Sequence, residues 1–164
     1  MSNTTFNCKE FSVQVRGESL KCLLAEPYRL FRRPALLLNF ALDRTTTLQT
    51  APYDITPRVF VAAGHRAVSF DLPYHGERAL SDRPQGIAGF YAEWTSSRDL
   101  FSRFVDNGHA IVDALIRRGL AEPGRIFVSG TSRGGYCALR FDGRRQAHRG
   151  DPRIRPRDGL ACTK

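Results

Sequence analysis

Three short, apolar-rich runs constrain the fold of this chain most strongly. They span residues 35–40, 66–71 and 125–129, and runs of this length and composition are typical of strands whose two faces are both covered. Helical patterns lie between them, at 57–64 and at 99–120, where apolar residues recur near helical spacing. This alternation of strands and helices predicts an α/β fold with a parallel sheet and right-handed crossovers.

A β-hairpin is predicted ahead of this alternation. Phe11–Val15 alternates apolar and polar residues, and Leu20–Ala25 follows after the turn-forming sequence Arg16–Glu18. A length of 164 residues suits one domain with a buried core. The predicted fold class is therefore α/β, with an amino-terminal hairpin followed by a mostly parallel sheet and flanking helices.

The third apolar run leads directly into Gly130-Thr131-Ser132-Arg133-Gly134, and a helix is predicted to begin at Arg133. A tight turn between a strand and a helix strains the backbone of its central serine and exposes the hydroxyl, while the flanking glycines avoid collisions with neighbouring backbone. A glycine-rich turn without chemistry is the alternative interpretation. A phosphate-binding loop is excluded, because neither a Gly-Lys-Ser/Thr ending nor a G-x-G-x-x-G pattern is present.

A second motif follows the middle apolar run, with the sequence Phe70-Asp71-Leu72-Pro73-Tyr74-His75-Gly76-Glu77-Arg78. Together with Gly130-Thr131-Ser132-Arg133-Gly134-Gly135-Tyr136, it resembles the α/β-hydrolase superfamily, whose members often carry an Asp-x-x-x-His-Gly loop after the fourth strand. The subgroup it looks most like contains prolyl-oligopeptidase-like and dienelactone-hydrolase-like esterases and peptidases. The resemblance runs from about Leu36 to Arg140.

This resemblance implies roles for four residues. Ser132 would be the catalytic nucleophile. The backbone N–H of Arg133 would donate one hydrogen bond to the oxyanion of an acyl-transfer intermediate, and the N–H of Phe40 or Ala41 would donate the second. The sequence at this position is Asn39-Phe40-Ala41-Leu42, which differs from the His-Gly-Gly pattern of many relatives.

A serine nucleophile also needs a histidine base and an acidic residue that orients it. In the α/β-hydrolase family the acid and then the histidine follow the serine, on loops after later strands, and two further strand–helix units need roughly 60 residues. Only 32 residues follow Ser132, and the one histidine among them, His148, precedes Asp151 and Asp158. We therefore expect a chain truncated after the serine turn, without the later strands or a complete triad.

The formal net charge of +9 is concentrated at the carboxyl end. Residues 140–164 hold eight basic and three acidic residues and lack periodic apolar positions. Asp142-Gly143 and the arginines after it predict that the last helix stops after about two turns. We divide the chain into a hydrolase-like part, 1–140, and a basic, poorly patterned tail, 141–164. Disorder and a reading-frame error near Phe141 are the two interpretations of this tail.

The remaining histidines and the cysteines are predicted to be structural. The cysteines are scattered, without a disulfide framework or metal-ligand spacing, so reduced packing thiols and no metal or cofactor are expected. His75 is expected to be a hydrogen-bonded loop residue, and the other upstream histidines are expected in a turn and a helix. The cysteines are Cys8, Cys22, Cys137 and Cys162. The two other upstream histidines are His65, expected in the turn, and His109, expected in the helix.

Two functions remain open. One is a serine hydrolase that acts on small-molecule carboxylic esters or peptides by acyl transfer, an activity that this truncated chain need not retain. The other is a non-catalytic, hydrolase-like protein that binds a protein partner through an exposed sheet edge. No segment resembles a signal peptide or a membrane span, so a cytoplasmic location without a membrane partner is expected. The basic tail lacks interleaved aromatic residues, so no nucleic-acid partner is expected, and the sequence does not indicate an oligomeric state.

Overall fold

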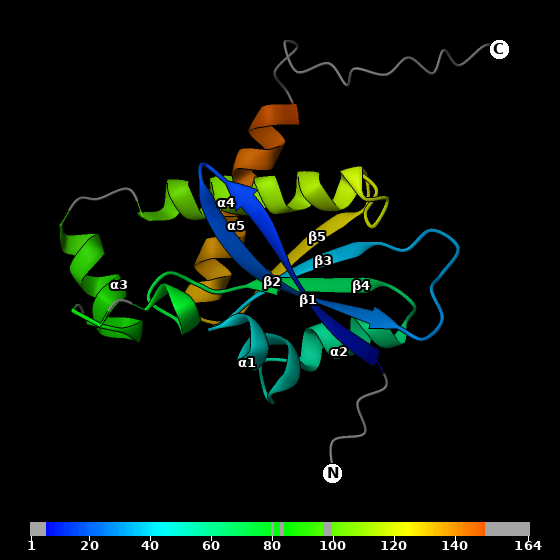
Figure 1. Ribbon diagram of the computed structural model, residues 1–164, viewed down its shortest axis with the longest axis horizontal. Helices are drawn as coiled ribbons and strands as arrows, with labels where there is room; N and C mark the ends of the chain where they lie inside the picture. The colour runs from blue at the N-terminus through cyan, green and yellow to red at the C-terminus, as the bar shows by residue number, and fades with distance from the viewer. Residues whose placement is uncertain (1–5, 80, 83, 97–99, 150–164) are drawn as a thin grey trace.

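A mixed five-stranded sheet forms the centre of the computed structural model, which describes residues 6–79, 81–82, 84–96 and 100–149. The strand order is β1-β2-β4-β3-β5 (Figure 1). The strands are β1 (Phe6–Val15), β2 (Glu18–Pro27), β3 (Leu36–Phe40), β4 (Arg66–Phe70) and β5 (Ile126–Gly130). The strand that leads into Ser132 therefore lies at one edge of the described sheet.

The sheet combines an antiparallel hairpin with three parallel strands. β1 and β2 pair along their whole length, and Arg16 and Gly17 form the turn between them with φ angles of 51° and 83°. Two successive positive φ values are what a two-residue hairpin turn requires to match the twist of its strands. β2 is antiparallel to β4, whereas β4, β3 and β5 run parallel to one another. This arrangement confirms the predicted fold class.

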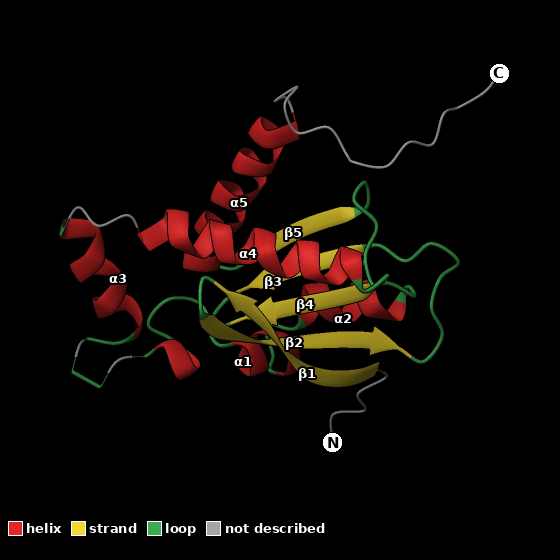
Figure 2. Ribbon diagram, turned by 45° about the horizontal axis from the view of Figure 1, so that its top comes forward, coloured by secondary structure: helices red, strands yellow, loops and turns green. Residues whose placement is uncertain are grey.

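Helices cover both faces of the sheet. Figure 2 shows α4 and α5 on one side of the strands and α1 and α2 on the other. Strand side chains alternate between these two layers, as the pleat of a strand dictates: Leu36, Leu38 and Phe40 pack toward α4 and α5, and Leu37 packs toward α1 and α2. The helices are α1 (Arg44–Gln49), α2 (Ile55–Ala62), α3 (Gly86–Thr95), α4 (Leu100–Arg117) and α5 (Arg133–Arg149), with a short 3-10 turn at Gly76–Arg78.

The larger core is centred on the fully buried ring of Phe40, at the end of β3. Its centroid lies 5.4 Å from that of Phe70, 5.1 Å from that of Phe104 and 6.4 Å from that of Phe141, in edge-to-face arrangements. Edge-to-face pairs at these separations are favourable beyond the apolar area that they bury. Phe40 thus joins β3 to β4, α4 and α5 directly below the turn that holds Ser132.

The structure departs from the sequence prediction in the last helix. The predicted interruption at Asp142-Gly143 is wrong, because the backbone stays helical through Arg149. Phe141, which is 1% exposed, anchors this helix against α4 and β3. A glycine in a helix costs only about 1 kcal/mol relative to alanine, which is too little to end a helix held by such an anchor. The rest of the predicted tail, 150–164, lies outside the described residues.

The helix α1 forms in the threonine-rich segment after β3. Asp43 caps this helix: its Oδ1 accepts hydrogen bonds from the N–H groups of Thr45 and Thr46, at 3.0 and 2.9 Å. A capping aspartate satisfies amide donors that otherwise have no partner in the first turn. The cap therefore compensates for the low helix propensity of threonine.

Candidate active site

Ser132 occupies a strained turn between β5, which ends at Gly130, and α5, which begins at Arg133. Its φ angle is +55°, in the left-handed region that costs a residue with a side chain about 1–2 kcal/mol. The Ser132 carbonyl accepts hydrogen bonds from the N–H groups of Gly135 and Tyr136, at 3.0 and 3.3 Å. The side chain remains exposed. The turn thus presents the serine hydroxyl to solvent at the amino terminus of a helix.

The two flanking glycines are required by close backbone contacts. A Cβ atom on Gly130 would collide with the carbonyl group of Gly134, and one on Gly134 would collide with the carbonyl group of Phe40. Neither backbone can yield easily, because Phe40 is paired with β5 and the Gly134 N–H donates to the Thr131 carbonyl at 3.0 Å. The pattern Gly-x-Ser-x-Gly therefore follows from contacts between the turn and the end of β3.

The predicted oxyanion donors lie around this contact. The Phe40 carbonyl accepts a hydrogen bond from the Thr131 N–H at 2.9 Å, and Phe40 is paired in register with Gly130. Ala41 is the first residue beyond β3, and its backbone nitrogen would lie 2.9 Å from a Cβ on Gly134. Arg133 is the first residue of α5, where backbone N–H groups have no acceptor within the helix. Ala41 and Arg133 thus both lie beside the turn that holds Ser132.

The loop after β4 is held by a buried carboxylate. Asp71 is 3% exposed, and its two oxygens accept hydrogen bonds from the backbone N–H and the Nη1 of Arg44, at 2.8 and 2.9 Å, and from the Glu77 N–H at 2.9 Å. Gly76, with φ +53°, passes so close that a Cβ there would collide with this carboxylate. The Asp-x-x-x-His-Gly motif is therefore a structural unit, with Asp71 and Gly76 in direct contact.

His75 belongs to this loop and faces the serine turn, where it contacts Arg133. Its Nδ1 is 2.9 Å from the Pro73 carbonyl oxygen, and its Nε2 is 3.4 Å from Nη2 of Arg133. Because an arginine nitrogen can only donate, Nε2 accepts and Nδ1 carries the proton. The Arg133 guanidinium also lies over the Phe90 ring, 5.3 Å from its centroid. The prediction of His75 as a hydrogen-bonded loop residue is confirmed.

The other histidines do not contribute to the site. His65 precedes β4 at the opposite end of the sheet, where its ring centroid lies 5.6 Å from Phe31 and 4.9 Å from Phe60. His109 packs on Phe141, at 4.6 Å between centroids. His148 lies in the last turns of α5, whose side chains are outside the described part of the structure.

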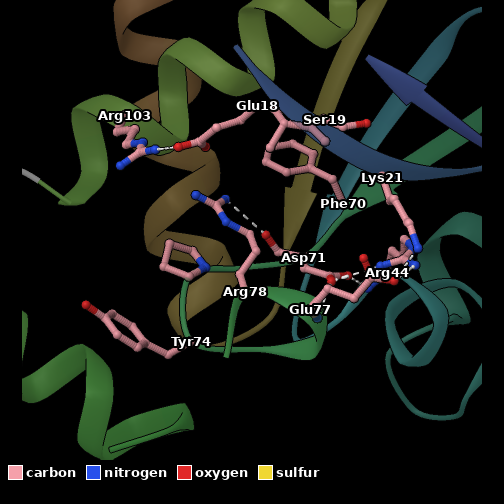
Figure 3. A pocket seen from close by; sticks show the side chains of 12 residues that line it. Glu18, Ser19, Lys21, Arg44, Phe70, Asp71, Tyr74, Glu77, Arg78 and Arg103 are labelled. Atoms are coloured by element: carbon pink, nitrogen blue, oxygen red, sulfur yellow. Dashed lines mark hydrogen bonds and ion pairs between the residues drawn. The ribbon is translucent and has the colours of Figure 1, made fainter. Parts of the chain in front are cut away.

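A cavity of about 510 Å³ opens beside the loop after β4. Its walls come from the start of β2, this loop and Arg103 of α4 (Figure 3), and neither Ser132 nor Arg133 lines it. Sequence reasoning did not identify this cavity, because the residues that form it are far apart in the chain and carry no recognisable spacing.

The described cysteines are free thiols. Burial raises the pKa of the Cys22 thiol, and likewise that of the Cys137 thiol, to about 12, so both stay protonated at neutral pH and are poor nucleophiles. Within the described ranges, no three histidine, cysteine or carboxylate side chains form a group that could hold a metal ion. None of the described helices is both long and apolar enough to cross a bilayer.

The sequence matches no protein-family model and no curated protein. Its structure, however, is similar to solved structures. A cold-adapted esterase from an Arctic intertidal metagenomic library matches with a TM-score of 0.61 at 19% identity, over 86% of this chain and 57% of that one. The chain has part of an α/β-hydrolase fold.

Two further structures support this assignment of the α/β-hydrolase fold. Acetyl xylan esterase 1 from Thermoanaerobacterium sp. matches with a TM-score of 0.59 at 17% identity, over 86% of this chain and 45% of that one. A prolyl endopeptidase matches with a TM-score of 0.54 at 16% identity, over 84% of this chain and 19% of that one. The chain therefore spans between 19% and 57% of the length of these three proteins.

Proposed function

We propose that this protein is a serine hydrolase that acts on carboxylic esters or peptides by acyl transfer, with Ser132 as its nucleophile. The observation that carries the proposal is the strained turn, in which a serine with φ +55° is held between two glycines that permit no side chain. A glycine-rich turn without chemistry gives no reason for a non-glycine residue at this positive φ.

In the proposed reaction the Ser132 Oγ attacks the carbonyl carbon of the substrate and expels the alcohol or amine. The negative charge that develops on the carbonyl oxygen is stabilised by the N–H groups of Arg133 and Ala41. We prefer Ala41 to Phe40 as the second donor, because Phe40 lies inside β3 and is paired with Gly130. Water then hydrolyses the acyl enzyme and restores Ser132.

The proton of Ser132 needs a base, and His75 is not oriented for this role. Its Nδ1 faces the Pro73 carbonyl, whereas an orienting carboxylate is the usual partner of a catalytic histidine, and its Nε2 faces Arg133. We propose that base and acid come from outside the described residues, as expected for a chain that spans about half of an esterase of this fold. The described residues alone are therefore expected to support only slow acylation.

The experiment combines labelling by a fluorophosphonate with turnover of p-nitrophenyl acetate. Wild-type chain is expected to be labelled slowly at Ser132, located by peptide mass spectrometry, and to turn over the ester slowly, whereas Ser132→Ala is expected to lose both the label and the turnover. Ser12→Ala, a change at an exposed serine of β1, is the matched control and should retain both. An unlabelled Ser132 in the wild type, or a label that survives Ser132→Ala, would contradict the proposal.

A second candidate function is protein association through the β5 edge. β5 has a strand on one side only within the described sheet, and Phe127 in this strand is 54% exposed. An unpaired strand edge with exposed apolar residues favours association. Light scattering of the wild type and of Phe127→Lys tests this function: a complex that persists unchanged in the variant would argue against the β5 edge as its interface.

We also propose a cytoplasmic location, with a small-molecule ester or peptide as substrate. The free thiols of Cys8, Cys22 and Cys137 support this location, because thiols persist in a reducing compartment.

A further inference from the structure

The cavity beside the loop after β4 holds an unusual set of charges. Four cationic side chains line it, and so do three carboxylates (Figure 3). The cationic residues are Lys21, Arg44, Arg78 and Arg103, and the carboxylates are Glu18, Asp71 and Glu77. The cavity thus carries one more positive than negative charge.

Ion pairs account for each carboxylate and for three of the four cations. Asp71 pairs with Arg44 at 2.9 Å, and Glu77 pairs with Lys21 at 2.8 Å and with Arg44 at 2.9 Å. Glu18 pairs with Arg103. The remaining cation is Arg78, which forms no direct ion pair with a carboxylate among the residues that the structure describes, although Glu18 and Asp71 lie near enough to act on its charge.

Arg78 points its guanidinium into this space, toward Glu18 and Arg103 in Figure 3. Its one hydrogen bond to a described residue is long, 3.3 Å from Nη1 to the backbone carbonyl oxygen of Asp71. Burial lowers the pKa of the Arg78 guanidinium and the positive charge of Arg103 lowers it further, while the negative charges of Glu18 and Asp71 oppose this in part. The surroundings therefore disfavour the positive charge of Arg78, and an anion bound in the cavity would stabilise that charge.

Apart from Ser19, the other walls of the cavity are largely apolar. Leu20, Phe70, Pro73 and Tyr74 line it, and all four are buried. A volume of about 510 Å³ lies in the range of small-molecule sites, which typically combine apolar walls with a few polar groups that fix the ligand. The guanidinium of arginine presents paired N–H donors that match the two oxygens of a carboxylate or phosphate.

We propose that this cavity binds a small organic anion, with its carboxylate or phosphate group on the guanidinium groups of Arg78 and Arg103 and its apolar part against Phe70. Arg103 takes part because its pair with Glu18 is more than half exposed on both sides and is therefore weak. The site is separate from Ser132 and does not depend on the proposed hydrolase reaction.

Titration of the isotope-labelled chain with sodium benzoate and with inorganic phosphate tests this site. Backbone amides and arginine Nε–H groups are followed by NMR, and chloride keeps the ionic strength constant. At least one probe is expected to saturate its shifts around Arg78. Saturation by benzoate alone indicates a carboxylate ligand, and saturation by phosphate alone indicates a phosphate ligand; either result supports the site.

Variants distinguish the site from general charge effects. Arg78→Gln should raise the Kd by roughly tenfold or more, and Arg103→Gln by roughly threefold. Should Arg78→Gln fail to fold, Arg78→Lys keeps the charge but loses the paired donors, and is expected to bind several times more weakly than wild type. Arg33→Gln is the matched control: Arg33 is exposed and paired with Glu122, remote from the cavity, and the change should leave the Kd within about twofold.

Two results would overturn the inference. One is an NMR chemical-shift change that stays linear with concentration for both probes. The other is an equal loss of binding affinity in Arg33→Gln and Arg78→Gln. Ser132→Ala should bind the probe as the wild type does. A failure of the proposed reaction at Ser132 is thereby distinguished from a failure of this site.

Discussion

The contact between Gly134 and the end of β3 gives a direct test of the serine turn. In Gly134→Ala the added methyl group would overlap the carbonyl carbon and oxygen of Phe40 and would lie 2.9 Å from the nitrogen of Ala41. All three atoms belong to backbone. A side chain could rotate away from a new methyl group, but here either β3 or the start of α5 has to move.

The size of the effect follows from what such a movement disrupts. β3 is hydrogen-bonded to β4 on one side and β5 on the other, and the Phe40 ring packs against three other aromatic rings. Overpacking of a well-packed core costs about 1–3 kcal/mol when side chains can yield, so a clash among backbone atoms should cost roughly 3 kcal/mol or more. This is a large part of the roughly 5–15 kcal/mol that stabilises a typical domain.

Urea unfolding followed by circular dichroism measures this effect. Gly124→Ala is the matched control, because a Cβ at Gly124 meets no atom within 4 Å and its φ is not positive. This control should change the free energy of unfolding by less than about 1 kcal/mol in either direction. A Gly134→Ala protein as stable as Gly124→Ala would refute the close approach of the turn to β3.

Three further predictions concern charge and ionisation. Asp71→Asn should destabilise the chain by roughly 3 kcal/mol in urea unfolding, because it breaks a buried pair with Arg44. The control Lys9→Ala, at an exposed pair, should cost less than about 1 kcal/mol. Equal costs in the two variants would contradict a structural role for the buried pair. Asp43→Ala should cost about 1 kcal/mol at pH 7. Burial opposes ionisation of Asp43, but hydrogen bonds from Thr46 and neighbouring N–H groups outweigh it and lower its pKa. The stabilisation by Asp43 is therefore present above the ordinary pKa of about 4 and is lost as the pH falls through the lowered value. A difference in stability between wild type and Asp43→Ala that persists at lower pH would argue against the cap. The Cys22 thiol, with its pKa raised to about 12, should resist iodoacetamide at pH 8 until the chain unfolds, as peptide mass spectrometry can follow, and rapid alkylation of the folded chain would contradict its burial.

The sheet was predictable from the sequence because its parallel strands are short, apolar and separated by helical patterns. The helix α3 was not, because its large apolar residues do not all mark its buried side. Ile87, Tyr91 and Trp94 are 71%, 70% and 63% exposed, whereas Gly89, Phe90 and Glu93 are buried. A periodicity argument assigns the apolar residues to the core, and in this helix that assignment fails for these three residues and is correct for Phe90.

The candidate site was predictable only where it is local in sequence. The serine turn is contained in five consecutive residues, and the strain at Ser132 agrees with the motif. The anion cavity depends instead on Glu18 and Arg103, which are 85 residues apart and meet only because the hairpin turn lies against α4. Likewise, no spacing in the sequence indicates that Arg133 stacks on Phe90.

Within the described sheet, β5 pairs with β3 along one edge of its backbone and with no strand along the other. The Leu36 N–H donates to the Arg125 carbonyl, and the Thr131 N–H donates to the Phe40 carbonyl, so the odd-numbered residues of this segment direct their backbone groups toward β3. Because orientation alternates along a strand, Ile126, Val128 and Gly130 direct theirs outward. In deuterium exchange the amides of this strand should therefore alternate between slow and fast, and a chain that docks along the edge would slow only the fast set.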